Sequence, residues 1–288
     1  MDWINTIVQG ALIGGLYALF AAGLSLMFGV MRLVNIAHGD LIVLAAYLGL
    51  IVVEGLGFNP FMSLIIVVPV MFVVGYLLQR GLLNFTLGTD ILPPLLVTFG
   101  LSIIIENVLL EIFSADSQRL DIGPFETASL QLTDELAIGW FPVVIFGTAV
   151  VVIGLLELLL YRTALGRAFR ATSDDADTAR LYGVRNRHIF ALATAIALAV
   201  ISVAAILMAI RQNFDPALGP ARLIYAFEAV IIGGLGSLWG TLAGGVVLGI
   251  AQSVGAKLNP GWETLAGHVA FLIVLVIRPR GLFPKIFD

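Results

Sequence analysis

This sequence has no cysteine and only three histidines in 288 residues. Without cysteine the chain forms no disulfide and offers no thiolate to a metal ion. The histidines His38, His188 and His268 stand far apart, a spacing that gives no zinc motif. Charged residues make up 12% of the chain, against roughly 25% in a typical soluble domain. No basic stretch is large enough to suggest a nucleic-acid surface. The sequence therefore argues against a soluble, disulfide-stapled or nucleic-acid-binding protein.

Motifs for catalysis are also missing. The chain lacks the phosphate-binding pattern G-x-x-x-x-G-K-[ST], the G-x-S-x-G turn of hydrolases and the HExxH helix of metalloproteases. The fragment Gly234-Leu235-Gly236 has neither the third glycine nor the strand–turn–helix setting of a dinucleotide site. We therefore expect a protein that is not an enzyme and holds no cofactor. If ATP drives it, another chain binds the ATP.

Apolar residues, by contrast, make up 60% of the chain, with a mean hydropathy of +1.05. About 20 apolar residues in a helix cross the hydrocarbon core of a bilayer. The first apolar run begins at Ile4, has no basic residue before it and is too long for a signal peptide, so we expect it to be a span. The sequence predicts an all-helical (all-α) integral membrane protein, a single bundle of eight to nine spans. The predicted spans are 6–29, 33–53, 60–79, 91–112, 140–160, 189–210, the pair 222–233 and 240–256, and 262–278.

Glycine marks a break within that pair. The run 222–233 reaches only about 18 Å, too short to cross a bilayer alone. Glycines and a serine follow it, and they predict a break or a re-entrant turn: Gly233, Gly234, Gly236, Ser237 and Gly240. Further along, Gly240, Gly244, Gly245 and Gly249 have the small-residue spacing that lets membrane helices pack closely.

An arginine-rich loop at 161–187 orients the chain. It holds six of the fifteen Lys and Arg residues, and such loops stay in the cytoplasm. With the pair 222–256 entering from and returning to the outer side, the N-terminus lies outside and the C-terminus in the cytoplasm. Eleven basic residues are then cytoplasmic: Arg32, Arg80, Arg162, Arg167, Arg170, Arg180, Arg185, Arg187, Arg278, Arg280 and Lys285. Four lie on the outer half: Arg119, Arg211, Arg222 and Lys257.

The same loop has the pattern of a short amphipathic helix. Ala176, Ala179 and Gly183 fall near one face, and Gly183 stands where such a helix would end. A short cytoplasmic helix between two spans indicates that another protein docks there. In the alternative interpretation, the loop has no docking role and only fixes the topology.

Polar residues inside the spans are the candidates for a substrate path. Asn35, His38 and Asp40 stand at the start of the second span. In one interpretation Asn35 caps the helix, Asp40 meets its dipole and His38 is a packing residue. In the other, this is an unwound helix start that lines a path. Glu228 also has two interpretations: it pairs with Arg222 or Arg211, or it lines the path.

Several motifs in the right order resemble one family. They are 28–40 (FGVMRLVNIAHGD), 165–171 (LGRAFRA) continuing through 179–184 (ARLYGV), 232–237 (IGGLGS) and 278–283 (RPRGLF). Together they resemble the permease subunits of branched-chain amino acid ABC importers, and the chain is similar to the shorter of two related permeases. The resemblance runs from about residue 5 to 285.

The resemblance implies a multi-pass protein of the bacterial inner membrane that works with two ATPase subunits, a second permease subunit and a periplasmic substrate-binding protein. It also implies that 163–187 is the coupling helix that seats in the ATPase, although Ser173-Asp174-Asp175 departs from the usual loop motif of importers. Coupling residues are expected at Gly166, Arg167, Arg170, Asp175, Ala179 and Gly183. Path residues are expected at Asn35, His38, Gly39, Asp40, Glu228, Gly233, Gly234, Gly236 and Ser237.

Two alternatives remain open from the sequence. Similar permeases carry urea, short amides or aromatic acids, and an apolar path with few charges does not exclude them. A stand-alone channel or secondary transporter would function without an ATPase.

Overall fold

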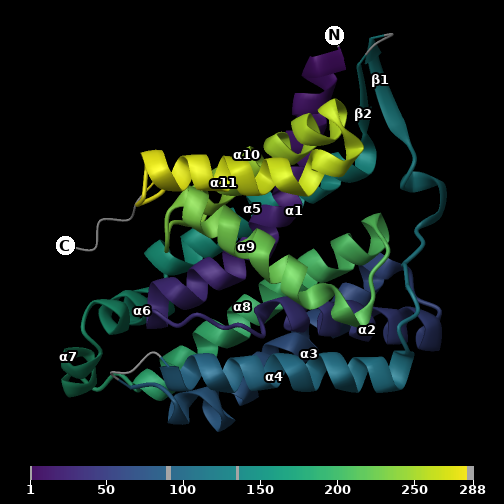
Figure 1. The fold of residues 1–288 in the computed structure, drawn as a ribbon. Helices are drawn as coiled ribbons and strands as arrows, with labels where there is room; N and C mark the ends of the chain where they lie inside the picture. The colour runs from purple at the N-terminus through teal and green to yellow at the C-terminus, as the bar shows by residue number, and fades with distance from the viewer. Residues whose placement is uncertain (1, 89–91, 134–135, 284–288) are drawn as a thin grey trace.

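The computed structural model describes residues 2–88, 92–133 and 136–283. Within these residues nine helices are long and apolar enough to cross a membrane, which confirms the upper value of the predicted count. They form one bundle (Figure 1). Their bounds are α1 Asp2–Met31, α2 His38–Leu56, α3 Pro60–Gly81, α4 Leu92–Phe113, α5 Trp140–Arg162, α8 Asn186–Arg211, α9 Gly219–Gly233, α10 Leu238–Leu258 and α11 Glu263–Ile277.

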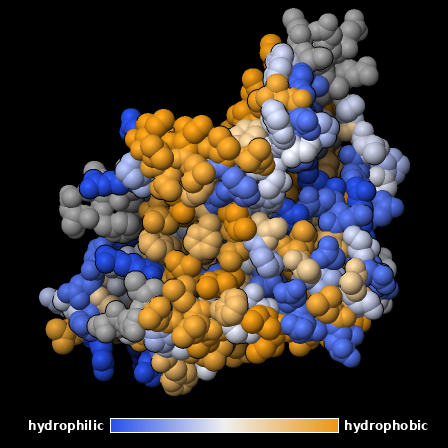
Figure 2. Space-filling model, in the orientation of Figure 1, coloured by the Kyte–Doolittle hydropathy of each residue, from blue (hydrophilic) through white to orange (hydrophobic). Residues whose placement is uncertain are grey.

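Two short structures mark opposite ends of the bundle. Helices α6 (Ala164–Asp174) and α7 (Ala176–Leu181) lie at one end, here called the α6–α7 end. Strands β1 (Ser129–Thr133) and β2 (Leu136–Gly139) lie at the other, here called the hairpin end, together with the start of α1 (Figure 1). Figure 2 shows an apolar face over the long helices, with polar residues gathered towards the two ends. This banding is what a membrane-spanning bundle requires.

A short β-hairpin outside the long helices accompanies the predicted all-helical bundle. β1 and β2 pair antiparallel, with Ser129 opposite Gly139 and Leu130 opposite Ile138. The segment lies beyond the long helices, and there its backbone N–H and C=O groups are satisfied by pairing between two strands instead of within a helix.

Two irregular connectors depart from the predicted spans. The second span was predicted from residue 33, but α2 begins at His38, because Arg32 adopts a left-handed φ of 52° and residues 32–35 are not helical. This connector, 32–37, is buried at Asn35 and Ala37, which are both 0% exposed. The connector between α8 and α9, 212–218, is likewise buried at Phe214. Each connector therefore places part of its irregular backbone in the interior of the bundle.

The two halves of the chain pack in the same way but run in opposite directions. α10 packs along α1 as α3 packs along α8, α9 contacts α1 as α2 contacts α8, and α11 contacts α9 as α4 contacts α2. One pairing lacks its counterpart, because α11 also packs on α10 whereas α4 has no comparable contact with α3. α1 runs away from the hairpin end and α8 runs towards it (Figure 1). This is an inverted-repeat arrangement, common in transporters.

Glycine allows a close contact between α1 and α10. A Cβ atom on Gly10 of α1 would lie 2.8 Å from the carbonyl oxygen of Gly249 on α10, and one on Gly245 would lie 2.7 Å from the backbone nitrogen of Ala18. The backbones of α1 and α10 thus touch directly, as the small-residue spacing predicts.

Candidate functional site

Helices α2 and α9 begin side by side in the interior. A Cβ on Gly39 would lie 2.9 Å from the backbone nitrogen of Leu223, and the carbonyl oxygen of Gly219 would be closer still. The depth of these helix starts in the bundle follows from a contact of His38, whose Nε2 donates to the carbonyl oxygen of Phe20 at 2.8 Å. Phe20 precedes the end of α1 by three turns, roughly 16 Å. The two helix starts therefore meet well inside the bundle.

Asp40 stands at this meeting point. Its side chain is 1% exposed, and the hydroxyl of Ser102 on α4 donates to its Oδ2. Its Oδ1 is buried without a partner, next to Gly219 at the start of α9. Because helix N-termini carry partial positive charge, two of them stabilise this carboxylate. Asp40 thus interacts with the helix dipole and also stands at an unwound helix start.

Asn35 and His38 complete the junction. The side-chain oxygen of Asn35 accepts from the backbone nitrogen of Ala37 at 3.0 Å, so it caps the turn that leads into α2. Its Nδ2 and the Nδ1 of His38 are buried without a partner. Buried polar atoms of this kind are rare in folded proteins, and three belong to neighbouring residues here.

A second polar cluster lies between α9, α10, α11 and α1. Nδ1 of His268 donates to Oε1 of Glu228, so Glu228 pairs with His268 and not with the predicted Arg222 or Arg211. The ring of Tyr225 lies 6.5 Å from that of His268 and 5.2 Å from that of Tyr17. Sequence reasoning missed His268 as a path candidate, although a histidine inside the apolar run 262–278 was a signal for it.

The glycine turn is remote from this junction. α9 ends at Gly233 and α10 begins at Leu238, so the chain leaves the helix within the glycine cluster. Gly234 and Gly236 have positive φ angles of 106° and 78°, which glycine adopts without strain. The side chain of Ser237 caps α10. The backbone nitrogens of Leu282 and Phe283 donate to the carbonyl oxygens of Ile232 and Gly233 at 2.8 and 2.9 Å. The structure thus places the turn at the α6–α7 end, against the C-terminal segment, and not beside Asp40.

The arginine-rich loop forms two helices where one was predicted. Asp175 separates them, because its backbone is extended and its side chain accepts from the backbone nitrogens of Asp177 and Thr178, each at 3.0 Å. Hydrogen bonds from the side chain and backbone of Thr178 hold the pKa of Asp175 below its usual value. Asp175 is therefore the N-cap of α7.

Helix α6 is fastened to the end of α5. A Cβ on Gly166 would overlap the carbonyl oxygens of Leu159 and Leu160. Arg170 donates to the Leu160 carbonyl at 2.9 Å and lies over the Tyr161 ring at 4.9 Å. Arg167 is exposed. Of the expected coupling residues, Gly166 and Arg170 therefore join α6 to α5.

The exposed tip of α7 consists of residues that sequence reasoning missed. Ala179 is 5% exposed and faces the protein, while Gly183, with φ of 87°, ends the helix as predicted. Leu181 and Tyr182 between them are 85% and 86% exposed. Two adjacent apolar or aromatic side chains that project from a polar end favour a docking contact.

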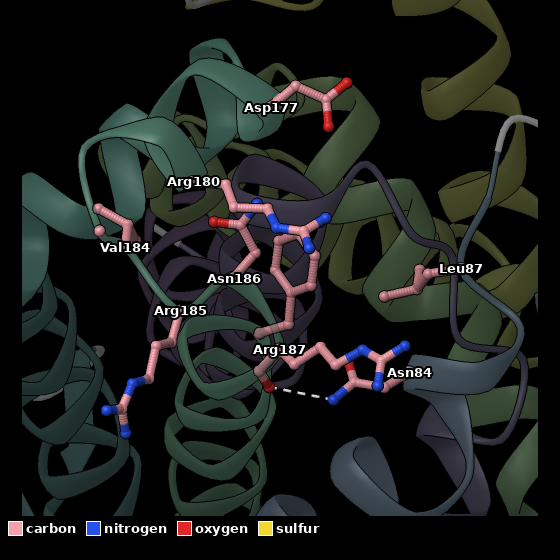
Figure 3. A pocket seen from close by; sticks show the side chains of 10 residues that line it. Asn84, Leu87, Asp177, Arg180, Val184, Arg185, Asn186 and Arg187 are labelled. Atoms are coloured by element: carbon pink, nitrogen blue, oxygen red, sulfur yellow. Dashed lines mark hydrogen bonds between the residues drawn. The ribbon is translucent and has the colours of Figure 1, made fainter.

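A groove of about 680 Å³ lies between α7 on one side and, on the other, the start of α8 and the connection between α3 and α4. In Figure 3 the side chains of Arg180 and Arg187 lie over it near Asn84 and Leu87, while Arg185 points away. The Nδ2 of Asn84 donates to the carbonyl oxygen of Arg187 at 3.0 Å, which ties the α3–α4 connection to α8. The groove is therefore basic and lies at the boundary between the apolar helices and the polar α6–α7 end.

Comparison with known proteins gives one family. Residues 6–277 match the model described as "Branched-chain amino acid transport system / permease component". The high-affinity branched-chain amino acid transport system permease protein BraD of Pseudomonas aeruginosa is 29% identical, over 98% of this chain and 96% of its own. The probable branched-chain amino acid transport permease protein LivH of Methanocaldococcus jannaschii is 30% identical, over 96% of this chain and 91% of its own. The permease protein LivM of Escherichia coli is 28% identical over 43% of this chain and 30% of its own.

Proposed function

Because this chain belongs to the family of branched-chain amino acid transport permease components, we propose that it is a membrane subunit of an ABC importer that carries branched-chain amino acids. The observation that carries the proposal is the junction of α2 and α9, where two helix starts meet at buried Asp40 inside a nine-helix bundle. Discontinuous helices with their N-termini at mid-depth are a recurring device for binding charged or zwitterionic solutes.

The distribution of arginine supports an orientation. We place the α6–α7 end in the cytoplasm, the N-terminus and the β-hairpin in the periplasm, and the α9–α10 pair as a hairpin that returns to the outer side. The described basic residues at the α6–α7 end include Arg32, Arg80 and those of 161–187, and positive residues favour the cytoplasmic side. The protein is then a multi-pass protein of a bacterial inner membrane.

The proposed partners are those that an ABC importer requires. Two ATPase subunits bind and hydrolyse ATP, so this chain needs no cofactor, and one of them docks on α7 through Leu181 and Tyr182. A second permease pairs with this one, and a heterodimer is favoured because part of the chain also resembles LivM. A periplasmic binding protein delivers the substrate at the hairpin end.

A physical route connects the docking helices to the junction. The hydroxyl of Ser173 at the end of α6 donates to the carbonyl oxygen of Gly29 in α1 at 2.6 Å. Gly29 in turn faces Gly236 of the glycine turn, since a Cβ on it would lie 3.5 Å from the Gly236 Cα. The connector 32–37 follows directly and leads to Asp40. Movement of α6–α7 by the ATPases would therefore reach the connector and the α9–α10 turn together, as alternating access requires.

The test is transport by the complete importer. Proteoliposomes with the two permeases and the ATPases, ATP inside and loaded binding protein outside, should accumulate labelled leucine, isoleucine or valine. Uptake of urea, short amides or aromatic acids instead would assign another substrate. Uptake by this chain alone, without ATPases, would overturn the importer in favour of a channel or secondary transporter.

A further inference from the structure

We propose that Arg222, Tyr225, Glu228 and His268 form a recognition site for the charged backbone of an amino acid. Arg222 binds the α-carboxylate and Glu228 binds the α-ammonium group. This inference rests on the proposed function, because it names the groups that hold the transported zwitterion.

The spacing on α9 suits such a ligand. Arg222, Tyr225 and Glu228 follow one another at three-residue intervals, so they lie on neighbouring positions along one side of the helix. Arg222 and Glu228 are about 9 Å apart along the helix axis. The two charged groups of an α-amino acid, each with a charge-assisted hydrogen bond of about 2.8 Å, span roughly the same length.

Each charged residue has an atom that nothing in the described chain satisfies. Oε2 of Glu228 and Nε of Arg222 are buried without a hydrogen-bond partner, although Oε1 of Glu228 is held by His268. Close by, Gln252 accepts from the hydroxyl of Tyr17 through its oxygen, and its Nε2 is likewise unpartnered. Leaving such groups unpaired in a membrane interior is costly, and a zwitterion supplies both the donor and the acceptor that they lack.

One member of the cluster reaches the protein surface. The side chain of Glu228 is 5% exposed, whereas that of His268 is 39% exposed, so the pair extends from the interior to the surface along α11. In Figure 2 a polar spot interrupts the apolar face over α11. Ionisable side chains at membrane depth rarely face lipid. We therefore place the second permease against this face, so that the site borders the path between the two subunits.

The site distinguishes among the candidate substrates. The carboxylate of Glu228 and the guanidinium of Arg222, about two turns apart on α9, match a molecule that carries both a positive and a negative charge. Urea and short amides have neither charge, and an acid without an amino group lacks the partner for Glu228. The rings of Tyr17 and Tyr225, 5.2 Å apart, supply an aromatic wall for an apolar side chain.

The test uses the complete importer with its loaded binding protein. Arg222→Gln and Glu228→Gln should each lower leucine uptake on the order of 10- to 100-fold, the effect of a lost hydrogen bond to a charged group. Assembly with the partners and ATP hydrolysis stimulated by the binding protein should persist. The matched control is Lys257→Gln, which removes a cation that lies over the Trp3 ring at the hairpin end, 4.6 Å from its centre, and should leave uptake unchanged.

The outcomes separate the two proposals. If the unaltered importer carries no branched-chain amino acid, the proposed function is wrong. If it does, and both glutamine variants take up leucine like Lys257→Gln, the recognition site is wrong. Should the glutamine variants fail to assemble, Arg222→Lys and Glu228→Asp decide instead: reduced uptake by an assembled complex supports the site, and unchanged uptake overturns it.

Discussion

The substitution Gly39→Ala tests the contact between the starts of α2 and α9. The added methyl group would overlap the carbonyl oxygen of Gly219 and approach the backbone nitrogen of Leu223 to 2.9 Å. Both neighbours are backbone atoms in a buried helix start, so no flexible side chain can move aside. The two helices must separate, and Asp40 and its contact with Ser102 must shift with them.

The cost follows from the packing. Overpacking of a tight interior typically destabilises by about 1–3 kcal/mol. For a domain of 150–250 residues each kcal/mol lowers the melting temperature by roughly 2–4 °C. We therefore expect Gly39→Ala to melt about 2–12 °C below the unaltered protein.

Gly147→Ala in α5 is the matched control. It makes the same chemical change in a helix, but a Cβ there meets nothing within 4 Å. It should melt at or slightly above the unaltered protein, because alanine favours the helix. The assay heats detergent-solubilised protein in steps and measures the monodisperse fraction by fluorescence-detected size exclusion. Equal melting of Gly39→Ala and Gly147→Ala would refute the close contact of the two helix starts.

Three further predictions concern the α6–α7 end. Replacing both Leu181 and Tyr182 with alanine should weaken ATPase binding by about 2–4 kcal/mol, because docking would bury two exposed apolar side chains. Co-purification with the ATPase measures this binding, and unchanged binding would contradict the docking role. The lowered pKa of Asp175 means that its carboxylate stabilises α7 above about pH 4 and that this stabilisation is lost as the pH falls through the folded-state pKa. Amide hydrogen exchange of α7 in the unaltered chain can follow this loss, and Asp175→Asn should abolish it. Gly183→Ala should destabilise the end of α7 by roughly 1–2 kcal/mol, because φ of 87° is strained for alanine, and faster amide exchange there would show it.

The sequence predicts well what depends on a short stretch of chain. The long helices were located within a few residues, because about 20 apolar residues are a local signal. The end of α7 at Gly183 was also predicted, because a glycine after a helix is a local signal of the same kind. The unwound segment before α2 was anticipated as one of two interpretations.

Contacts between distant segments were not predictable in the same way. The approach of Gly39 to Gly219 joins residues far apart in the chain, and no local pattern reports it. The pairing of Glu228 with His268 depends on how α11 packs against α9, so the sequence suggested only the nearer arginines as partners. The role of Asp175 as a cap was missed because the loop was interpreted as one continuous helix.

Helix α5 has a consequence for how the chain is inserted into the membrane. α1–α4 make four crossings, an even number, which would return the chain to its starting side and give α8–α11 the same sense as α1–α4. The single crossing of α5 changes the parity, so the second set enters upside down and its helices can pair with those of the first. α5 thus sets the direction of the second set of helices relative to the first. A chain without α5 would present two parallel sets, and the starts of α2 and α9 would then face the same way and could not meet head to head.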